Sequence, residues 1–215
     1  MAGQEINQYA IERNTIGDLD YFDLDWNDSG VFKTAKIKGS VFKGINGGLF
    51  AQTEDGPLLQ NTTTESSILG AGAGTLLIPA NTWVVGQSYT LLATGTMDAV
   101  LNDSITFTLK SSTADFVFTG AATLFQATGN KYWELKMLMT CRQIGGVGVA
   151  EIEGSGTFQY KADTGGQYRC FPIEWNNPTT FDTTIDHTLD LTGQWSAASA
   201  NNRLMTRTVN FKRTF

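Results

Sequence analysis

The sequence of 215 residues is poor in the residue types that build metal sites and disulfide frameworks. It contains two cysteines, one histidine and four prolines. A structural zinc site needs four Cys or His ligands, which this composition cannot supply. Two cysteines also exclude a disulfide-rich scaffold, so stability has to come from packing. We therefore expect neither a metal ion nor a cofactor.

Charged residues and long apolar runs are scarce as well. Asp, Glu, Lys and Arg make up 17% of the chain, and no stretch of 18 apolar residues occurs, so no membrane-spanning helix is expected. The first twenty residues carry neither a basic cluster nor an apolar run, and no secretory signal is predicted. Fifteen basic residues against 21 acidic ones make nucleic acid an unfavourable partner. We expect no membrane partner either.

The net charge of −6 is concentrated at the N-terminus. Residues 1–30 contain seven acidic residues and one basic residue, so the remaining fourteen acids and fourteen bases leave the rest of the chain neutral. Aromatic and aliphatic residues alternate with these acids at Tyr21, Phe22, Leu24 and Trp26. We predict that this acidic leader anchors the protein on a larger particle by adding a strand to a partner. A solvated tail, or a leader packed on its own head domain, is the alternative.

A glycine-punctuated stretch follows over residues 31–60. The tripeptide VFK occurs at 31–33 and again at 41–43, and apolar pairs alternate with Lys and Gly without a helical period. A segment this short cannot cover its own apolar side chains, whereas several copies of the segment packed together can. We predict a short oligomeric stalk or linker here, with two ordinary edge strands of the main domain as the alternative.

Residues 61–215 alternate apolar and polar residues with a period of two, as expected for antiparallel sheets covered on one face. No amphipathic helix is evident. The fold class predicted is all-β, an antiparallel β-sandwich of jelly-roll type with about eight strands and an extended N-terminal segment. The expected strands are 75–78, 88–96, 104–111, 115–119, 131–141, 149–161, 183–195 and 203–213.

The alternation also predicts which side chains face the core. Three of the expected strands and their inward residues are clear: Ile105, Phe107 and Leu109; Trp133, Leu135, Met137, Met139 and Cys141; and Ile185, His187, Leu189, Leu191 and Trp195. In the last strand, Met205, Val209 and Phe211 are expected on one face, and Thr206, Thr208 and Asn210 on the other. His187 is thus predicted to be a hydrogen-bonded interior histidine rather than a catalytic base.

The order of several phrases resembles the C-terminal head domains of viral fibre and spike proteins, especially those of tailed phages. The stretch 49–101 contains NTTTESSIL, a glycine run, IPANTW and VGQSYTLLATG, and the C-terminal part contains HTLDLTGQW, the small-residue turn SAASANN and a final strand. The resemblance covers roughly residues 49–211. It implies a β-sandwich head, a homotrimer and a place on a virion. The segment before the head is shorter than in a long fibre, which favours a short spike, penton or capsid-surface protein.

No motif predicts catalysis. The glycine runs lack the endings of nucleotide-binding loops, and no Gly-x-Ser-x-Gly motif occurs. Asp23, Asp25 and Asn27 have the spacing of the first calcium ligands of an EF-hand, but the required glycine and glutamate that follow are absent. Glu151 and Glu153 share one strand face, where carboxylates are normally solvated. We therefore predict that the chain is not an enzyme.

The stretch 162–182 is predicted to be a long loop that carries contact residues. Tyr168, Arg169, Phe171 and Trp175 are of the types enriched in protein interfaces, and aromatic rings also stack on sugars. Contact with identical subunits and contact with a host receptor or glycan both remain open.

Taken together, the sequence predicts a virion structural protein: a capsid-attached spike, fibre, penton or decoration protein, located on the virion, that mediates assembly and host attachment. Its predicted partners are identical subunits in a homotrimer, other capsid proteins, and a host receptor or glycan. The alternative is a carbohydrate-binding, lectin-like module.

Overall fold

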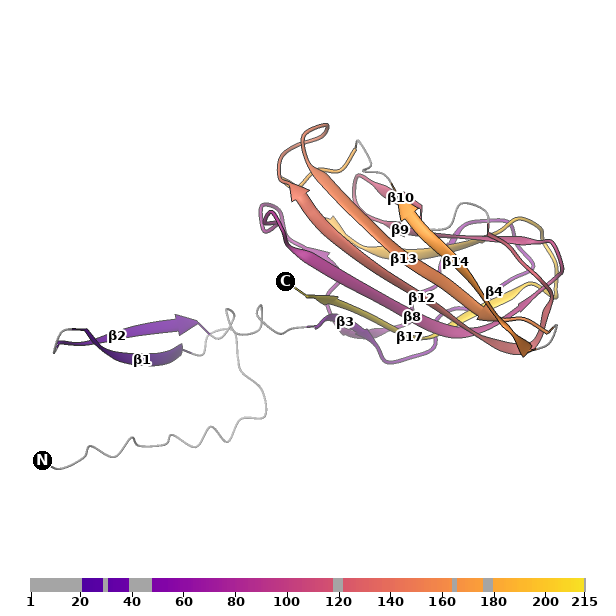
Figure 1. Cartoon of the computed structure of the whole chain (residues 1–215), viewed down its shortest axis with the longest axis horizontal. Coiled ribbons are helices and arrows are strands. Elements are labelled where there is room, and N and C mark those ends of the chain that lie inside the picture. Colours follow the sequence, from indigo (N-terminus) through magenta and orange to yellow (C-terminus); the bar gives the residue numbers. More distant parts are fainter. Residues whose placement is uncertain are drawn as a thin grey trace, which may run out of the picture. The chain divides into compact units, whose positions relative to one another are not determined.

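The computed structural model describes residues 21–28, 31–38, 48–117, 122–163, 166–175 and 180–214. The chain divides into two compact units, Met1–Gly47 and Gly48–Phe215. Each unit is described on its own (Figure 1). All secondary-structure elements described in the two units are β-strands, and a single residue has 3-10 geometry. The prediction of an all-β fold is confirmed.

The second unit is built from two main antiparallel sheets. The larger sheet has the order β14 (Tyr168–Trp175), β13 (Glu151–Lys161), β12 (Ala127–Gln143), β8 (Ser88–Ala99), β17 (Arg203–Arg213), β3 (Gly48–Gln52) and β6 (Gly72–Gly74), and β4 (Leu59–Gln60) also pairs with β17. The smaller sheet has the order β10 (Asp115–Val117), β9 (Ser104–Lys110), β16 (Asp190–Trp195) and β5 (Ser66–Ser67), with β11 (Ala122–Thr123) also on β9. A short pair joins β7 (Leu77–Ile78) to β15 (His187–Thr188).

Strand pairing identifies the fold as a jelly roll with one addition. A jelly roll has eight strand positions, numbered here in chain order. The first pairs with the eighth (β3 with β17), the second with the seventh (β5 with β16), and the third with the sixth (β8 with β12). The fourth, β9, pairs with the fifth, which consists of β10 and β11. A long two-stranded ribbon rolled into two sheets gives this nested pattern. The prediction of a jelly-roll sandwich is confirmed.

The addition is the hairpin of β13 and β14, which extends the larger sheet beyond β12. All eight predicted strand ranges overlap an observed strand, but β14 was predicted to be part of a long loop over 162–182. That prediction was wrong for residues 168–175. An edge strand needs ladder hydrogen bonds on one side only, so it tolerates Pro172 and an irregular pattern.

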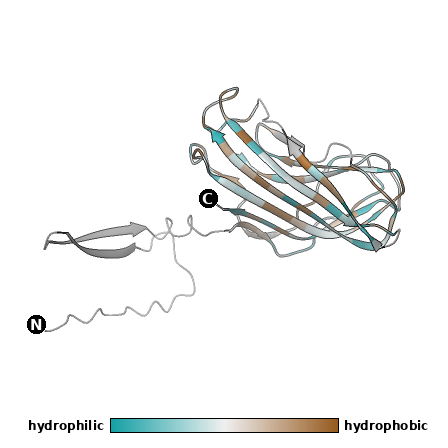
Figure 2. Ribbon diagram, viewed as in Figure 1, coloured by the Kyte–Doolittle hydropathy of each residue, from teal (hydrophilic) through white to brown (hydrophobic). Residues whose placement is uncertain are grey.

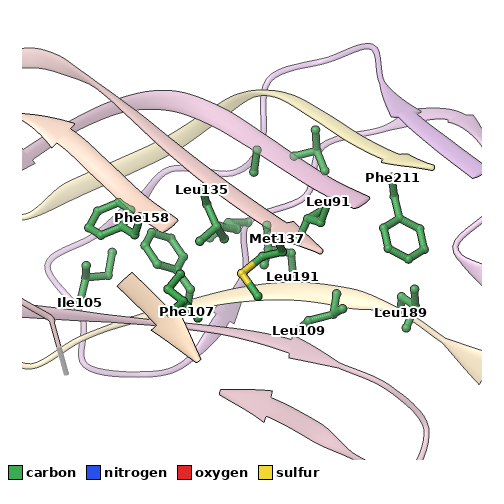
Figure 3. Close-up of a cluster of buried hydrophobic side chains, with 14 of the residues drawn as sticks. Leu91, Ile105, Phe107, Leu109, Leu135, Met137, Phe158, Leu189, Leu191 and Phe211 are labelled. Carbon is green, nitrogen blue, oxygen red and sulfur yellow. The ribbon is translucent and has the colours of Figure 1, made fainter. Parts of the chain in front are cut away.

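The core lies between the two sheets and is rich in aromatic rings. Phe107 of the smaller sheet stacks at 5.4 Å on Trp133 and lies 5.0 Å from Phe158, both in the larger sheet, measured between ring centroids. Figure 3 shows further aliphatic side chains of both sheets filling the space beside these rings. The predicted inward residues of β9 and β12 are all buried. Figure 2 shows the resulting alternation of hydropathy along the strands of the larger sheet.

The last strand, β17, departs from the predicted alternation. A β-bulge between Thr206 and Thr208 inserts one residue against β8, so the faces exchange at that point. Val209 and Phe211 are buried as predicted, but Thr206 is buried and Met205 is not. The hydroxyl of Thr206 donates to the carbonyl of Ile68, which satisfies it inside the core.

The compact unit begins earlier in the chain than residue 61, where the head was predicted to start. Phe50 of β3 pairs with Phe211, and Leu59 of β4 pairs with Leu204. Both Phe50 and Leu59 are buried. Residues 48–60 of the predicted linker therefore form part of the jelly-roll unit.

The first unit contains one described pair of strands, β1 (Tyr21–Asp28) and β2 (Val31–Lys38). They are antiparallel over their full length, from Tyr21 opposite Lys38 to Asp28 opposite Val31. No third strand joins them among the residues that the structure describes. The second VFK repeat, at 41–43, lies outside the described residues.

Candidate functional site

The predicted contact residues lie on β14, the edge strand of the larger sheet. Tyr168 is 57% exposed and pairs with Lys161. Arg169 and Phe171 pair with Tyr160 and Phe158, whose side chains face the core. Trp175 ends the strand opposite Gly154. The strand therefore presents Tyr168 to solvent and turns Arg169 and Phe171 toward the core.

Arg169 and Phe171 close the open edge of the core. The ring of Phe171 stacks on Phe158 at 5.9 Å and on Tyr160 at 6.3 Å, so most of its contact is internal. The guanidinium carbon of Arg169 lies 4.2 Å from the ring centroid of Phe125. Such cation–π contacts stabilise a half-exposed arginine without an acid partner. These two side chains have a packing role that sequence reasoning did not assign to them.

Tyr160 of β13 links this side of the larger sheet to Phe125, in the segment that precedes β12. Its hydroxyl accepts a hydrogen bond from the backbone N–H of Phe125 at 2.7 Å and donates to the Phe125 carbonyl at 3.3 Å. Burial raises the pKa of Tyr160, although the Phe125 backbone and Arg169 oppose this. The phenol therefore stays neutral and can make both bonds.

Asp163 holds the end of β13 against the start of β12. Its carboxylate accepts hydrogen bonds from the hydroxyl of Thr128 at 2.7 Å and the N–H of Thr128 at 3.2 Å, and pairs with Lys131 at 3.2 Å. The Thr128 bonds, followed by Lys131, lower the pKa of Asp163. The ionised form is thus preferred in the folded protein.

We expect Asp163→Asn to lower the melting temperature at pH 7. The lowered pKa means that the stabilisation is complete above the ordinary value of 3.8 and disappears as the pH falls through the folded-state value. The melting temperatures of the two proteins should therefore converge at acidic pH, as measured by circular dichroism between pH 2 and 7. A difference that stays constant over this range would contradict the assignment.

A second group of polar and aromatic side chains lies on the outer face of the larger sheet. Tyr132, 39% exposed, donates its hydroxyl proton to Glu134 at 3.0 Å, and the same carboxylate accepts from the amide of Gln159 at 2.9 Å. Burial, with the Glu134 carboxylate, raises the pKa of Tyr132 to about 12. Tyr132, Glu134 and Gln159 thus form one hydrogen-bonded group, and the exposed Tyr168 lies on β14, which β13 separates from β12.

A third surface is an apolar tip, which sequence reasoning missed. Two loops at one end of the sandwich carry five exposed aliphatic side chains, each 48–60% exposed: Val84, Val85, Ile144, Val147 and Val149. Figure 2 shows apolar segments in the loop that joins β12 to β13. Large apolar groups gathered on adjacent loops are typical of interaction surfaces.

Backbone hydrogen bonds hold the two loops of the apolar tip together. The N–H of Gly86 donates to the carbonyl of Cys141, and the N–H of Cys141 donates to Gln87, which fixes the first loop beside the end of β12. The second loop turns at Gly148, whose φ of +79° favours glycine. Gly48, the first residue of the unit, pairs with Lys212 at this same end. The sequence signal was the run IGGVGV at 144–149, between two expected strands, which sequence reasoning considered only as one of the glycine runs that do not bind nucleotides.

The predicted anchoring residues Tyr21, Phe22, Leu24 and Trp26 all lie on β1. The register places Phe22, Leu24 and Trp26 on one face of the hairpin and Tyr21 on the other. Sequence reasoning grouped the four without this distinction.

His187 is buried, and its Nε2–H donates to the carbonyl of Asp182. The prediction of a hydrogen-bonded interior histidine is confirmed. The ring packs edge-on against Trp83 at 6.1 Å and lies 5.3 Å from Phe181. Cys141 is buried and Cys170 is exposed, and neither forms a disulfide.

Clusters that could carry metal chemistry are absent from the described part of the chain. No group of three or more His, Cys, Asp or Glu side chains there is arranged to hold a metal ion. Glu153, one of the two carboxylates considered for catalysis, pairs with Arg142 at 2.8 Å. Within the same residues, no helix is long and apolar enough to cross a membrane.

Comparison with known proteins adds no relative. No protein-family model matches the chain, and no curated protein and no solved structure matches it either.

Proposed function

We propose that this chain is a virion structural protein, a capsid-attached spike, fibre, penton or decoration protein. In this proposal the jelly-roll unit is the head of a homotrimer on the virion, and the acidic leader anchors it on other capsid proteins. The head then presents its free surface to a host receptor or glycan. The resemblance of residues 49–211 to viral fibre and spike heads supports the proposal, and so does the jelly-roll fold.

The observation that carries the proposal is the apolar tip. Five aliphatic side chains exposed at one end of an otherwise well-packed sandwich favour contact with protein over contact with a small molecule. The chain enters the jelly-roll unit at Gly48, at this same end. A neutral body lacks the net charge that would oppose such association.

Mass spectrometry of particles purified from the source that encodes the chain tests the proposal. Peptides of this protein should be present in a fixed copy number relative to the major shell protein. Their absence from intact particles would overturn the assignment to the virion.

Substitution tests the role of the apolar tip in the proposed attachment. Val147→Lys places a charge on the tip, and Leu138→Lys is the matched control, since Leu138 is 48% exposed on the outer sheet face. Both variants should keep the wild-type melting temperature. We expect Val147→Lys to reduce incorporation into particles at least tenfold and Leu138→Lys to leave it unchanged. Equal incorporation of both variants would contradict docking through the tip.

A carbohydrate-binding, lectin-like module is the second candidate. The exposed rings of Tyr132, which is hydrogen-bonded to the Glu134 carboxylate, and of Tyr168 favour it, because aromatic faces stack on sugars while polar groups bind hydroxyls. A glycan array separates the candidates. Binding that Tyr168→Ala abolishes, by a protein that particles lack, would favour the lectin.

A further inference from the structure

The β1–β2 hairpin has two different faces. In an antiparallel pair, residues opposite each other share a face and successive residues alternate. The register therefore gathers six apolar residues on one face, where charges occur only near the turn end, at Asp28 and Lys33. The apolar set is Phe22, Leu24, Trp26, Val31, Ala35 and Ile37.

The opposite face is more polar, although it also includes Phe32, opposite Asn27. It carries four charged residues, with Asp23 opposite Lys36 and Tyr21 opposite Lys38. A lone two-stranded hairpin is only marginally stable in water, and stability requires further strands or a partner on the apolar face. The hairpin therefore needs a partner that covers its apolar face.

The two strands also differ in charge. β1 contains three acidic residues and no basic one, whereas β2 contains three lysines and no acidic one. The hairpin thus has one acidic outer edge and one basic outer edge. Pairing of like edges between two copies would place like charges opposite one another, which destabilises a sheet. Pairing of β1 of one copy with β2 of the next places opposite charges together.

We infer that the hairpin at residues 21–38 is a self-association module, in which β2 of each copy pairs with β1 of the next and the apolar faces enclose a shared core. Such head-to-tail contacts form a ring when the rotation between successive copies closes, as three copies related by a threefold axis do. With all hairpins oriented alike around the ring axis, each new pair is antiparallel, as within the hairpin, and no strand edge is left open. The inference deepens the homotrimer of the proposed function, and the expected number of three copies rests on that proposal. It assigns Phe22, Leu24 and Trp26 to contact between copies, so attachment to other capsid proteins then rests on the apolar tip.

Light scattering of the full-length chain after size exclusion tests the shared core. The wild type should have about three times the protomer mass of 23.4 kDa. Leu24→Lys charges the apolar face and should give a protomer-sized particle. Thr34→Lys adds the same side chain on the polar face, opposite Asp25, and should keep the wild-type mass. The jelly-roll unit should melt at the same temperature in all three proteins, so loss of mass is not loss of that fold.

Charge exchange tests the pairing of unlike edges. Replacing Lys33, Lys36 and Lys38 of β2 with Glu makes both edges acidic and should give protomers. Adding Asp23→Lys, Asp25→Lys and Asp28→Lys exchanges the two edges and should restore the assembly. A sixfold variant that stays a protomer would overturn the edge pairing.

The outcomes separate this inference from the proposed function. A wild-type protomer, or a Leu24→Lys protein with unchanged oligomer mass, overturns the hairpin module. Presence of the protein in purified particles would still support the virion assignment in either case. Loss of assembly in Leu24→Lys with retention in Thr34→Lys supports the module whether or not the protein is found in particles.

Discussion

Gly95→Ala is expected to destabilise the jelly-roll unit by about 3 kcal/mol, a typical cost of overpacking a rigid site. Gly95 lies in β8 between Thr206 of β17 and Trp133 of β12. A methyl group there would meet the carbonyl oxygen of Met205 at 2.0 Å and the indole nitrogen of Trp133 at 2.9 Å. The first of these atoms belongs to the backbone beside the β17 bulge and cannot rotate away.

Gly193→Ala is the matched control for this change. The added methyl group would meet only side-chain carbons, those of Leu59, Ile68 and Leu204, at 3.1–3.4 Å. Both substitutions alter the unfolded chain equally, so the difference reports the native state. For a domain of this size, about 3 kcal/mol corresponds to roughly 10 °C in melting temperature. Equal melting temperatures of the two variants would show that β17 can shift away from β8.

Period-two alternation was sufficient to predict the central strands. β9 and β12 lie in the middle of their sheets, are covered by the opposite sheet and expose the other face, so burial imposes the pattern directly on the sequence. The same reasoning gave the buried position of His187, because its neighbours Leu189 and Leu191 are inward as well. For such strands, side-chain burial outweighs every other local preference.

Where burial is incomplete, the sequence signal weakens. β14 lies at an edge, carries Pro172 and turns Arg169 inward, so neither composition nor alternation distinguishes it from a loop. The bulge in β17 exchanges faces within one strand, and a fixed period of two cannot represent that. Alternation alone places Phe22, Leu24 and Trp26 on one face of β1, but the residues of β2 that join them depend on the register, which is a property of the pair.

The apolar tip was missed for a spatial reason. Val85 and Val147 are far apart in the chain, and each alone is an unremarkable exposed valine. Only the hydrogen bonds that hold Gly86 and Gln87 against Cys141 bring the first loop beside the end of β12, from which the second loop departs. A surface assembled from two loops is therefore predictable only once the strand pairing is known.

Phe107→Ala is expected to lower the free energy of unfolding by about 3–5 kcal/mol, the usual cost of removing a buried ring and leaving a cavity. Phe107 is fully buried, and its contacts with Trp133 and Phe158 join the smaller sheet to the larger one. Among the residues that the structure describes, these two strand assemblies are separate sheets, so the packing of side chains between them contributes strongly to holding them together. Urea unfolding followed by tryptophan fluorescence measures the loss.

Phe125→Ala removes the same atoms from a side chain that is 44% exposed and packs mainly under Arg169. Its cost should stay near 1 kcal/mol, since a half-exposed ring leaves no closed cavity and a cation–π contact at such a site is worth about 0.5–1 kcal/mol. A similar loss in both variants would mean that the edge at β14, rather than the centre at Phe107, limits the stability of the sandwich. A larger loss of unfolding free energy at Phe107 would mean that contact between the two sheets limits the stability of the sandwich. The apolar residues of the alternating strands face that contact.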